Sequence, residues 1–397
     1  MTTSPLQDAP LLAALEDGWR TSRPTAASTT LALGARAAMV DRVSLNAALQ
    51  YFKPHAQALQ DRAVTPMALP QELSSQHFDR VLLWPSTVRA AARGELVLAW
   101  QHLHDHGELI AAQHNDRGAR SLQTDAEALF GTVVVTSRHR CRTVHISKRS
   151  ANFNAEVAQS WLHAAQPHRN EALGLWTQAG VFAADRIDAG SALLLRCFPE
   201  DLQGEVADLG AGVGVLSLHL ARRCHRVTRL DLYEADARAV VLAERNFSEF
   251  LAASADWTTA QTRRECSLHT TEFAQSPRSF AGRHGIPFDS HDPHPLPCAT
   301  LLARHLGLHW HDVTTGLPRP YDIIVSNPPF HASGDQSHEL GLAFIRVARQ
   351  ALRPGGELWL VANRHLPYED LLQRSFASVD TRLQADGYKV LHARKPH

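Results

Sequence analysis

A motif of one asparagine, two prolines and a phenylalanine has the residue types needed to position an amine for methylation. An apolar run at 323–325 indicates a buried strand, and one serine later the chain continues Asn327, Pro328, Pro329, Phe330. The side-chain oxygen of Asn327 and the carbonyl oxygen of Pro328 can each accept one N–H of an exocyclic amine, while Phe330 can stack on the base. Such a nitrogen is a poor nucleophile because its lone pair is delocalised into the ring. Two well-placed acceptors would orient it for attack.

A glycine-rich turn earlier in the chain indicates a site for a nucleotide-like cofactor. Residues 205–209 read as a short strand, and the turn after it contains Gly210, Gly212 and Gly214. Glycine permits positive φ and a close approach of the backbone to a ligand, and the following helix start favours negative charge. The glycines alone would also fit a dinucleotide site. Asp208 stands two positions before the first glycine, which favours a ligand with an amino group there over a pyrophosphate.

Two further acidic residues end the strand-like runs that follow. The run 229–234 ends in Glu234, about twenty residues after the glycines, and its carboxylate could accept both hydroxyls of a ribose. Asp236 is the alternative for this role, although an aspartate at a helix start also serves as a cap. The run 308–312 ends in Asp312, which could accept from an adenine amino group or could be a turn residue.

The elements that position these motifs occur twice. Strands alternate with helical stretches, which predicts parallel sheets with helices on both faces. Three landmarks recur in the same order in the two halves of the chain: 78–85 with 321–328, 107–109 with 356–358, and 143–148 with 389–394. Each set gives an aromatic residue, Asp, a short strand and a proline, then Gly-Glu-Leu, then a closing strand. Two α/β domains could share these patterns by chance, but duplication explains them better.

The repeat predicts two domains, one over about residues 1–165 and one over 171–397, joined by a polar linker at 164–170. Within the second domain, residues from about 251 to 300 are rich in Ser, Thr, His and Pro and lack periodicity, so we expect an insertion there. The insertion contains the potential metal ligands His284, His291, His294 and Cys298. A solvated loop or an RNA-contacting flap is the favoured interpretation, and no metal is expected.

Composition excludes several classes of protein. The chain has 397 residues, of which 44% are hydrophobic and 20% charged, so it is neither disordered nor fibrous. Lys plus Arg and Asp plus Glu number 40 each, so bulk charge gives no argument for nucleic-acid or membrane binding. The five cysteines form no C-x-x-C pair, and no signal peptide or membrane-spanning run is evident. We therefore expect a soluble, cytoplasmic protein with no membrane partner.

Charge is unevenly divided between the two halves. Residues 1–170 contain 17 Lys and Arg against 14 Asp and Glu, whereas the remainder contains 23 against 26. Five basic residues gather near the closing strand of the first half: Arg138, Arg140, Arg142, Lys148 and Arg149. They could contact phosphates, or they could protect an exposed edge strand from aggregation.

The C-terminal half resembles the bacterial ribosomal RNA guanine-N2 methyltransferases, which are class I S-adenosylmethionine-dependent enzymes. The similar stretches are 180–182, 187–191, 208–214, 327–331 and 361–368. The family also carries a degenerate N-terminal copy of its fold. The resemblance therefore implies an α/β protein of two tandem Rossmann-like methyltransferase domains with a degenerate first copy. That copy has Trp84-Pro85-Ser86 in place of the asparagine motif and no visible glycine-rich loop, so it is expected to bind RNA without catalysing.

The resemblance also implies a role for each site residue. The methionine part of S-adenosylmethionine would be held by Asp208 with Gly210, Gly212 and Gly214, the ribose by Glu234 and the adenine by Asp312. Guanine N2 would be positioned by the motif Asn327, Pro328, Pro329 and Phe330. The wall of the cofactor or base pocket would include Phe182 and Asp188.

The sequence thus predicts an enzyme that transfers a methyl group from S-adenosylmethionine to N2 of a guanine in ribosomal RNA. Its partner would be ribosomal RNA or a ribosomal subunit, and its process ribosome biogenesis. One alternative is an adenine-N6 or protein-glutamine methyltransferase of the same fold, although those enzymes more often carry tyrosine after the prolines. Another is a non-catalytic RNA-binding assembly factor, against which the two intact motifs argue.

Overall fold

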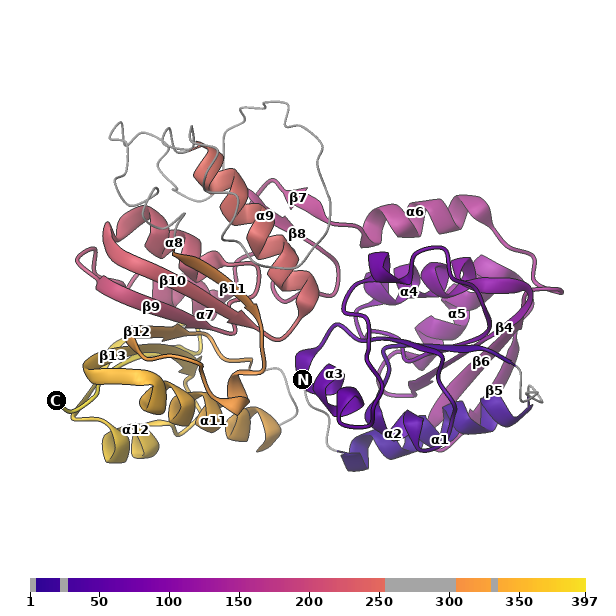
Figure 1. Cartoon of the computed structure of the whole chain (residues 1–397), viewed down its shortest axis with the longest axis horizontal. Helices are drawn as coiled ribbons and strands as arrows, with labels where there is room; N and C mark the ends of the chain where they lie inside the picture. The colour runs from indigo at the N-terminus through magenta and orange to yellow at the C-terminus, as the bar shows by residue number, and fades with distance from the viewer. Residues whose placement is uncertain (1–4, 22–27, 254–304, 330–334) are drawn as a thin grey trace. The chain divides into compact units, whose positions relative to one another are not determined.

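The computed structural model describes residues 5–21, 28–253, 305–329 and 335–397 (Figure 1). The chain divides into two compact units, Met1–Pro167 with Gln178–Gly180, and His168–Thr177 with Val181–His397. Each unit contains its own large sheet, covered by helices on both faces.

The first unit has a six-stranded sheet in the order β2-β1-β3-β4-β6-β5. Its strands are β1 (Thr30–Leu33), β2 (Ala47–Leu49), β3 (Phe78–Leu83), β4 (Leu103–His114), β5 (Val134–Arg138) and β6 (Cys141–Ser147). Its helices are α1 (Pro5–Thr21), α2 (Ala37–Val40), α3 (Lys53–Gln60), the 3-10 turn η1 (Pro70–Leu73), α4 (Arg89–Gln101), α5 (Ala119–Phe130) and α6 (Ala155–Ala165).

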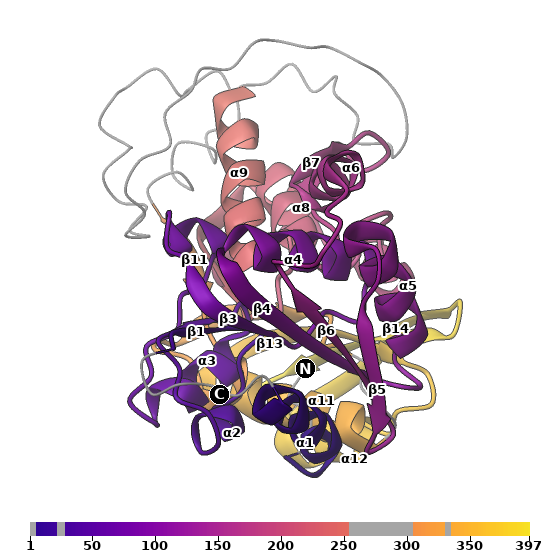
Figure 2. The same ribbon diagram turned by 90° about the vertical axis from the view of Figure 1, so that its right-hand side faces the viewer.

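Apolar residues on both faces of this sheet build two separate cores. Val81 of β3 points into one core with Trp161 of α6, and its neighbour Leu82 points into the other core with Leu15 of α1. Figure 2 shows the sheet between α4, α5 and α6 on one side and α1, α2 and α3 on the other. Successive strand residues alternate between faces, so an apolar run is what a sheet buried on both sides requires.

The second unit has a seven-stranded sheet in the order β11-β10-β9-β12-β13-β15-β14. Its strands are β9 (Gln203–Leu209), β10 (Arg226–Glu234), β11 (Leu306–Trp310), β12 (Tyr321–Ser326), β13 (Leu352–Asn363), β14 (Ser378–Ala385) and β15 (Tyr388–Arg394), with a separate hairpin of β7 (His168–Asn170) and β8 (Leu175–Thr177). Its helices are α7 (Ala189–Leu195), α8 (Val215–Arg223), α9 (Ala237–Ala253), the 3-10 turn η3 (Val313–Thr315), α11 (Asp335–Ala351) and α12 (Glu369–Ser375).

Two cores again lie on opposite faces of the sheet. Val325 of β12 packs with Leu194 of α7 and with Phe247 of α9 on one face. Its neighbour Ile324 packs on the other face with Ile345 of α11.

Strand order confirms the duplication predicted from the sequence. Apart from the edge strand β11, the second sheet repeats the first strand for strand, with parallel strands followed by an antiparallel pair. The two Gly-Glu-Leu landmarks occupy matching places, since Glu108 pairs with Ser147 and Glu357 pairs with Arg394. The predicted fold class, two tandem Rossmann-like domains, is therefore confirmed.

Two boundaries expected from the sequence differ in the structure. Residues 168–170, assigned to a polar linker, form strand β7, because their backbone pairs with β8. Helix α9 extends to Ala253, so the first residues of the predicted insertion are helical. The rest of the insertion, with His284, His291, His294 and Cys298, lies outside the described residues. No helix in the described part of the chain is long and apolar enough to span a bilayer.

Candidate active site

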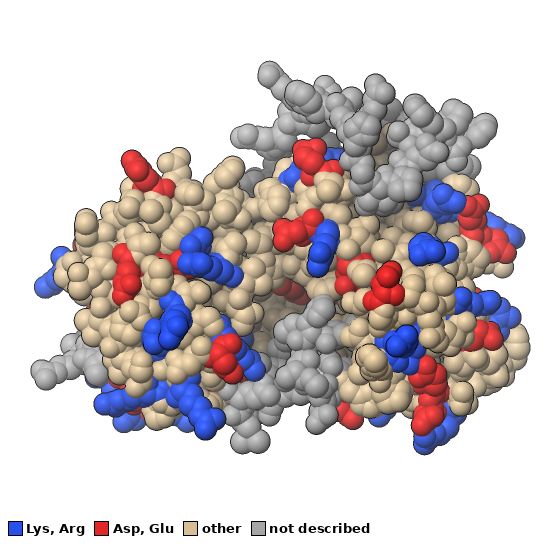
Figure 3. Space-filling view, turned by 180° about the vertical axis from the view of Figure 1, so that it is seen from behind, with Lys and Arg blue, Asp and Glu red and all other residues tan. Residues whose placement is uncertain are grey.

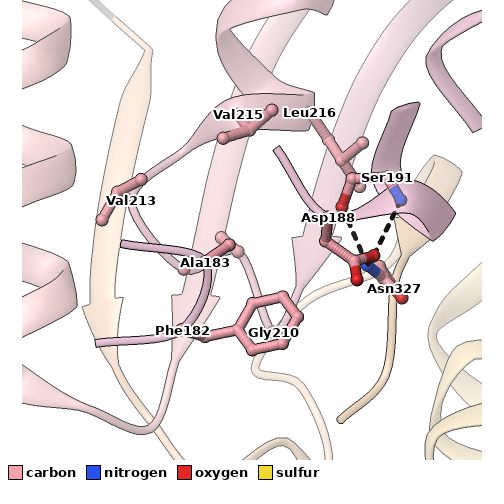
Figure 4. A pocket seen from close by; sticks show the side chains of 11 residues that line it. Phe182, Ala183, Asp188, Ser191, Gly210, Val213, Val215, Leu216 and Asn327 are labelled. Atoms are coloured by element: carbon pink, nitrogen blue, oxygen red, sulfur yellow. Dashed lines mark hydrogen bonds between the residues drawn. The ribbon is translucent and has the colours of Figure 1, made fainter. Parts of the chain in front are cut away.

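A pocket opens in the second unit at the carboxyl ends of β9 and β12 (Figure 4). These strands are neighbours in the middle of the sheet, where the chain order reverses direction, which is the usual place for a ligand in an open α/β sheet. The lining includes five of the predicted site residues and one that was not predicted: Phe182, Asp188, Gly210, Gly212, Asn327 and Ser191.

The glycine turn lines this pocket and leaves open space above its backbone. The amides of Gly210 and Ala211 both donate to the carbonyl of Tyr233, at 2.8 and 3.2 Å, which fixes the turn against β10. Gly212 has a φ of 56°, and a Cβ atom built on it would meet nothing within 4 Å. Gly214 adopts a left-handed conformation directly before α8. A bulky ligand can therefore lie against the bare backbone of the turn.

Asp208 is buried beside the glycine turn, and one of its two carboxylate oxygens lacks a hydrogen-bond partner among the described residues. Its Oδ2 accepts from the Ser217 hydroxyl at 2.7 Å, whereas Oδ1 has no partner among the described residues. The pKa of the Asp208 carboxyl is raised to about 7, chiefly by burial and also by nearby Glu234, against the lowering effect of the Ser217 hydrogen bond. A ligand bearing an ammonium group would supply the missing donor and charge, so the acceptor set fits the methionine end of S-adenosylmethionine.

Glu234, rather than Asp236, has a carboxylate oriented to the glycine turn. Its Oε2 accepts from the Gly212 amide and its Oε1 from the Asp236 amide, each at 2.8 Å. Burial raises the pKa of Glu234, partly offset by these backbone donors. Asp236 instead pairs with the Arg238 guanidinium and accepts from the Arg238 amide. Glu234 therefore lies against the glycine turn, whereas Asp236 caps the start of α9.

Asp312 lies two residues beyond β11, and one of its oxygens is already occupied. Its Oδ1 accepts from both the amide and the hydroxyl of Thr314, at 2.9 and 2.6 Å, and so caps the turn η3. This is the turn role that the sequence left open as an alternative. Oδ2 is the atom that remains for an adenine amino group.

Asn327 has a fixed amide orientation. Its Nδ2 donates to Oδ2 of Asp188 and to the Ser191 hydroxyl, both at 2.8 Å, and Figure 4 shows these three side chains together. Because both amide hydrogens are used, Oδ1 is the atom of this side chain available to accept from a ligand. The strand end before it is tied to β9, since the Ser326 hydroxyl donates to the carbonyl of Leu209 at 2.8 Å. Pro328 and Pro329 continue the backbone, and Phe330 lies outside the described residues.

The sequence did not predict the residues that hold these groups in place. Ser191 is the third residue of α7, and its amide donates to the side chain of Asp188, which caps the helix. An Asp three residues before Ser191 and ahead of an apolar run is a helix-start signal that could have indicated this contact. Asn246 of α9 binds the backbone of Trp176 and of Val213, and thereby ties β8 to the glycine turn. No local pattern in the sequence marks Asn246.

The basic residues near the closing strand of the first unit are partly engaged within that unit. Arg138 pairs with Asp17, Arg142 donates to Gln123, and Lys148 donates to the Leu103 carbonyl. On the face shown in Figure 3, basic and acidic side chains are mixed on both units. Within the described ranges, no three His, Cys, Asp or Glu side chains are grouped so as to hold a metal ion.

Comparison with known proteins identifies the family of the second unit. Residues 172–266 and 299–392 match the family model of the methyltransferase small domain, and the unmatched interval lies within the predicted insertion. "Ribosomal RNA small subunit methyltransferase C" of Pasteurella multocida is 27% identical over 287 residues, 72% of this chain and 71% of the relative. The protein of the same name from Acinetobacter baylyi is 24% identical over 349 residues, 87% of this chain and 85% of the relative.

A solved structure shares the fold of the whole chain. It is the T. thermophilus 16S rRNA N2 G1207 methyltransferase (RsmC) in complex with AdoMet and guanosine, with a TM-score of 0.68 and 24% identity. The alignment covers 97% of this chain and 92% of that one, so both units are included. The family model is matched on both sides of the insertion, so the second unit belongs to the methyltransferase small-domain family, as the resemblance in its sequence predicted.

Proposed function

We propose that this protein transfers a methyl group from S-adenosylmethionine to the exocyclic N2 of a guanine in small-subunit ribosomal RNA. The observation that carries the proposal is Asn327, whose amide nitrogen is held by two partners so that its oxygen is available beside the glycine turn. Relatives over most of the chain are named as ribosomal RNA small subunit methyltransferases, and the whole-chain structural relative contains AdoMet and guanosine.

The cofactor would be held by the residues around the glycine turn. Asp208 would accept from its ammonium group, Glu234 from its ribose hydroxyls and Asp312 from its adenine, with Gly212 as the bare floor. When bound there, S-adenosylmethionine supplies a methyl group on a positively charged sulfur, which is the electrophile of the reaction.

The contribution of the chain to the reaction is orientation. Asn327 Oδ1 and the Pro328 carbonyl would accept the two N–H groups of guanine N2 and turn its lone pair towards the electrophile. Phe330 would stack on the base. Holding a weak nucleophile in this geometry means that the entropy of bringing the reactants together is lost on binding and not in the reaction step. A paired guanine would have to leave its helix first, at a cost of a few kcal/mol.

The first unit would contribute RNA binding rather than chemistry. It repeats the fold without an asparagine motif, and its basic residues near β6 would contact phosphates in addition to the partners they already have. Such contacts are sequence-independent and would position the second unit's pocket over its target.

The test is identification of the product. Ribosomal RNA from a strain that lacks the protein is incubated with the full chain and S-adenosylmethionine, digested to nucleosides and analysed by mass spectrometry. We expect N2-methylguanosine at one position. N6-methyladenosine would support adenine as the substrate instead, and a parallel incubation with ribosomal proteins, digested to peptides, would reveal a methylated glutamine. Absence of any product, together with absence of cofactor binding by calorimetry, would support a non-catalytic assembly factor.

A further inference from the structure

Asp188 has one carboxylate oxygen that holds the asparagine and one that does not. Its Oδ2 accepts from Nδ2 of Asn327 at 2.8 Å and from the Ser191 amide at 3.0 Å. Within the described part of the chain, both hydrogen bonds of this carboxylate fall on Oδ2. The side chain lines the pocket and is only partly buried, so Oδ1 is accessible to a ligand (Figure 4).

The position of this oxygen matters because of the edge that guanine presents. Guanine carries two neighbouring donor groups, the N2 amine and the N1–H, and a carboxylate is the natural acceptor for an N1–H beside an amine. Adenine carries a bare acceptor nitrogen, N1, beside its N6 amine. A carboxylate facing adenine would place lone pair against lone pair. A glutamine side chain has no ring N–H at all.

We propose that Asp188 reads the base: its Oδ2 fixes Asn327, and its Oδ1 accepts the N1–H of the guanine whose N2 is methylated. This rests on the proposed function, and it places Asp188 on the base side of the pocket, one of the two positions that the sequence left open. One residue would then couple specificity to catalysis, because the carboxylate that accepts from N1 also orients the amide that accepts from N2. The same carboxylate would exclude adenine from the pocket.

The variant that separates these two roles is Asp188→Asn. An asparagine can keep an oxygen towards Asn327 and Ser191, and it is as good a helix cap as aspartate. Its amide would place a donor where Oδ1 was an acceptor. That donor would repel the N1–H of guanine and would match the bare N1 of 2-aminopurine, a base that also carries a 2-amino group.

The measurement is equilibrium binding of guanosine and of 2-aminopurine riboside to the full chain saturated with S-adenosylhomocysteine, which binds without reacting. We expect the ratio of the two dissociation constants to shift towards 2-aminopurine by about 10-fold or more in Asp188→Asn. Ser191→Ala is the matched control, because it removes the other support of Asn327 and should weaken both nucleosides in proportion. Asp188→Ser, which caps the helix but is too short to reach the base, should bring the ratio towards one.

Each outcome has a defined meaning. An unchanged ratio in Asp188→Asn that still binds S-adenosylhomocysteine overturns the inference, as does a loss of S-adenosylhomocysteine affinity with the ratio intact, which would make Asp188 a cofactor residue. If the wild-type chain forms N2-methylguanosine in ribosomal RNA while the ratio does not move, only the inference fails. If the wild-type chain neither binds guanosine nor methylates guanine, the proposed function fails with it.

Discussion

The glycine turn of the second unit has a counterpart in the first unit with nearly the same backbone. Gly34 has a φ of 68° and Gly210 a φ of 72°. The amides of Gly34 and Ala35 donate to the carbonyl of Leu49 at 3.0 and 3.2 Å, as those of Gly210 and its neighbour do to Tyr233. The duplicated turn has therefore kept its fold in both copies. A single glycine was enough to preserve it.

The side chains around the two turns differ in a consistent way. Arg36 takes the place of Gly212, and its guanidinium lies 4.9 Å from the ring centre of Trp84 and donates to the Gly34 carbonyl at 2.8 Å. By strand register, Trp84 occupies the position of Asn327. Burial lowers the pKa of Arg36 to about 10, against the raising effect of Asp8 and Glu95. The space left open over the second turn is therefore occupied by protein in the first.

The two acidic positions have also been replaced by residues without charge. Gln50 stands where Glu234 is, and its amide donates to the Ala35 carbonyl at 2.6 Å while its oxygen accepts from Phe52. Ala32 stands where Asp208 is. The first copy thus fills its turn with protein side chains, whereas the second leaves a buried carboxylate oxygen and a bare turn. Side chains at matching positions, rather than the backbone, therefore distinguish the ligand site from its structural copy.

Removing the asparagine should have the largest effect. Asn327→Ala is expected to lower turnover by about 10²–10³ with little change in cofactor affinity, because it removes one oriented acceptor from the reacting amine. Single-turnover methylation and calorimetry measure the two quantities. Trp84→Phe, at the equivalent position of the first unit, is the control and should turn over at the wild-type rate. Full turnover by Asn327→Ala would refute the role assigned to this residue.

Giving the second turn the side chain of the first should abolish cofactor binding. In Gly212→Arg, the long side chain would fill the open space above the turn, and affinity for S-adenosylmethionine should fall by about 100-fold or more. The positive φ of Gly212 adds a strain on the order of 1 kcal/mol. Gly212→Ala has this strain but little of the bulk. Near-wild-type affinity in Gly212→Arg would show that the cofactor lies elsewhere.

Replacing the buried acid should change stability in a pH-dependent way. The pKa of Asp208 is about 7 in the folded chain against its ordinary 3.8, so the folded state retains a proton that the unfolded state loses. Raising the pH from about 4 to 7 therefore destabilises the ligand-free protein, with the full cost present above pH 7. Asp208→Asn removes this cost, which is on the order of a few kcal/mol.

Thermal unfolding of the ligand-free proteins measures this difference. The variant should melt above the wild type at pH 8, and the difference should shrink towards pH 4. It should also bind S-adenosylmethionine about 10-fold more weakly, because the neutral amide is a poorer partner for an ammonium group. A difference in melting temperature that does not vary with pH would contradict the raised pKa.

Local motifs could be predicted from the sequence, but contacts between distant segments could not. The asparagine motif and the glycine turn are each contiguous, and the strands before them bury apolar runs, so their place at strand ends followed from the pattern. The bond between Asp188 and Asn327 joins residues far apart in the chain and exists only once α7 packs beside β12. Strand β7 is short and polar, because it pairs in an exposed hairpin, and periodicity could not reveal it.

Replacing Arg36, which fills the space over the turn of the first copy, should have the smallest effect on the enzyme. Arg36→Met keeps most of the volume and removes a buried charge, so stability should change by about 1 kcal/mol or less, with turnover unchanged. Arg36→Gly leaves a cavity and should cost about 2–4 kcal/mol. Even then the first copy should not bind S-adenosylmethionine, because Ala32 supplies no carboxylate. Calorimetry on Arg36→Gly combined with Gly212→Arg tests this, since the second site is blocked. Cofactor binding by that double variant would mean that the Arg36 side chain alone, and not the absence of the two acidic residues, prevents the first copy from binding the cofactor.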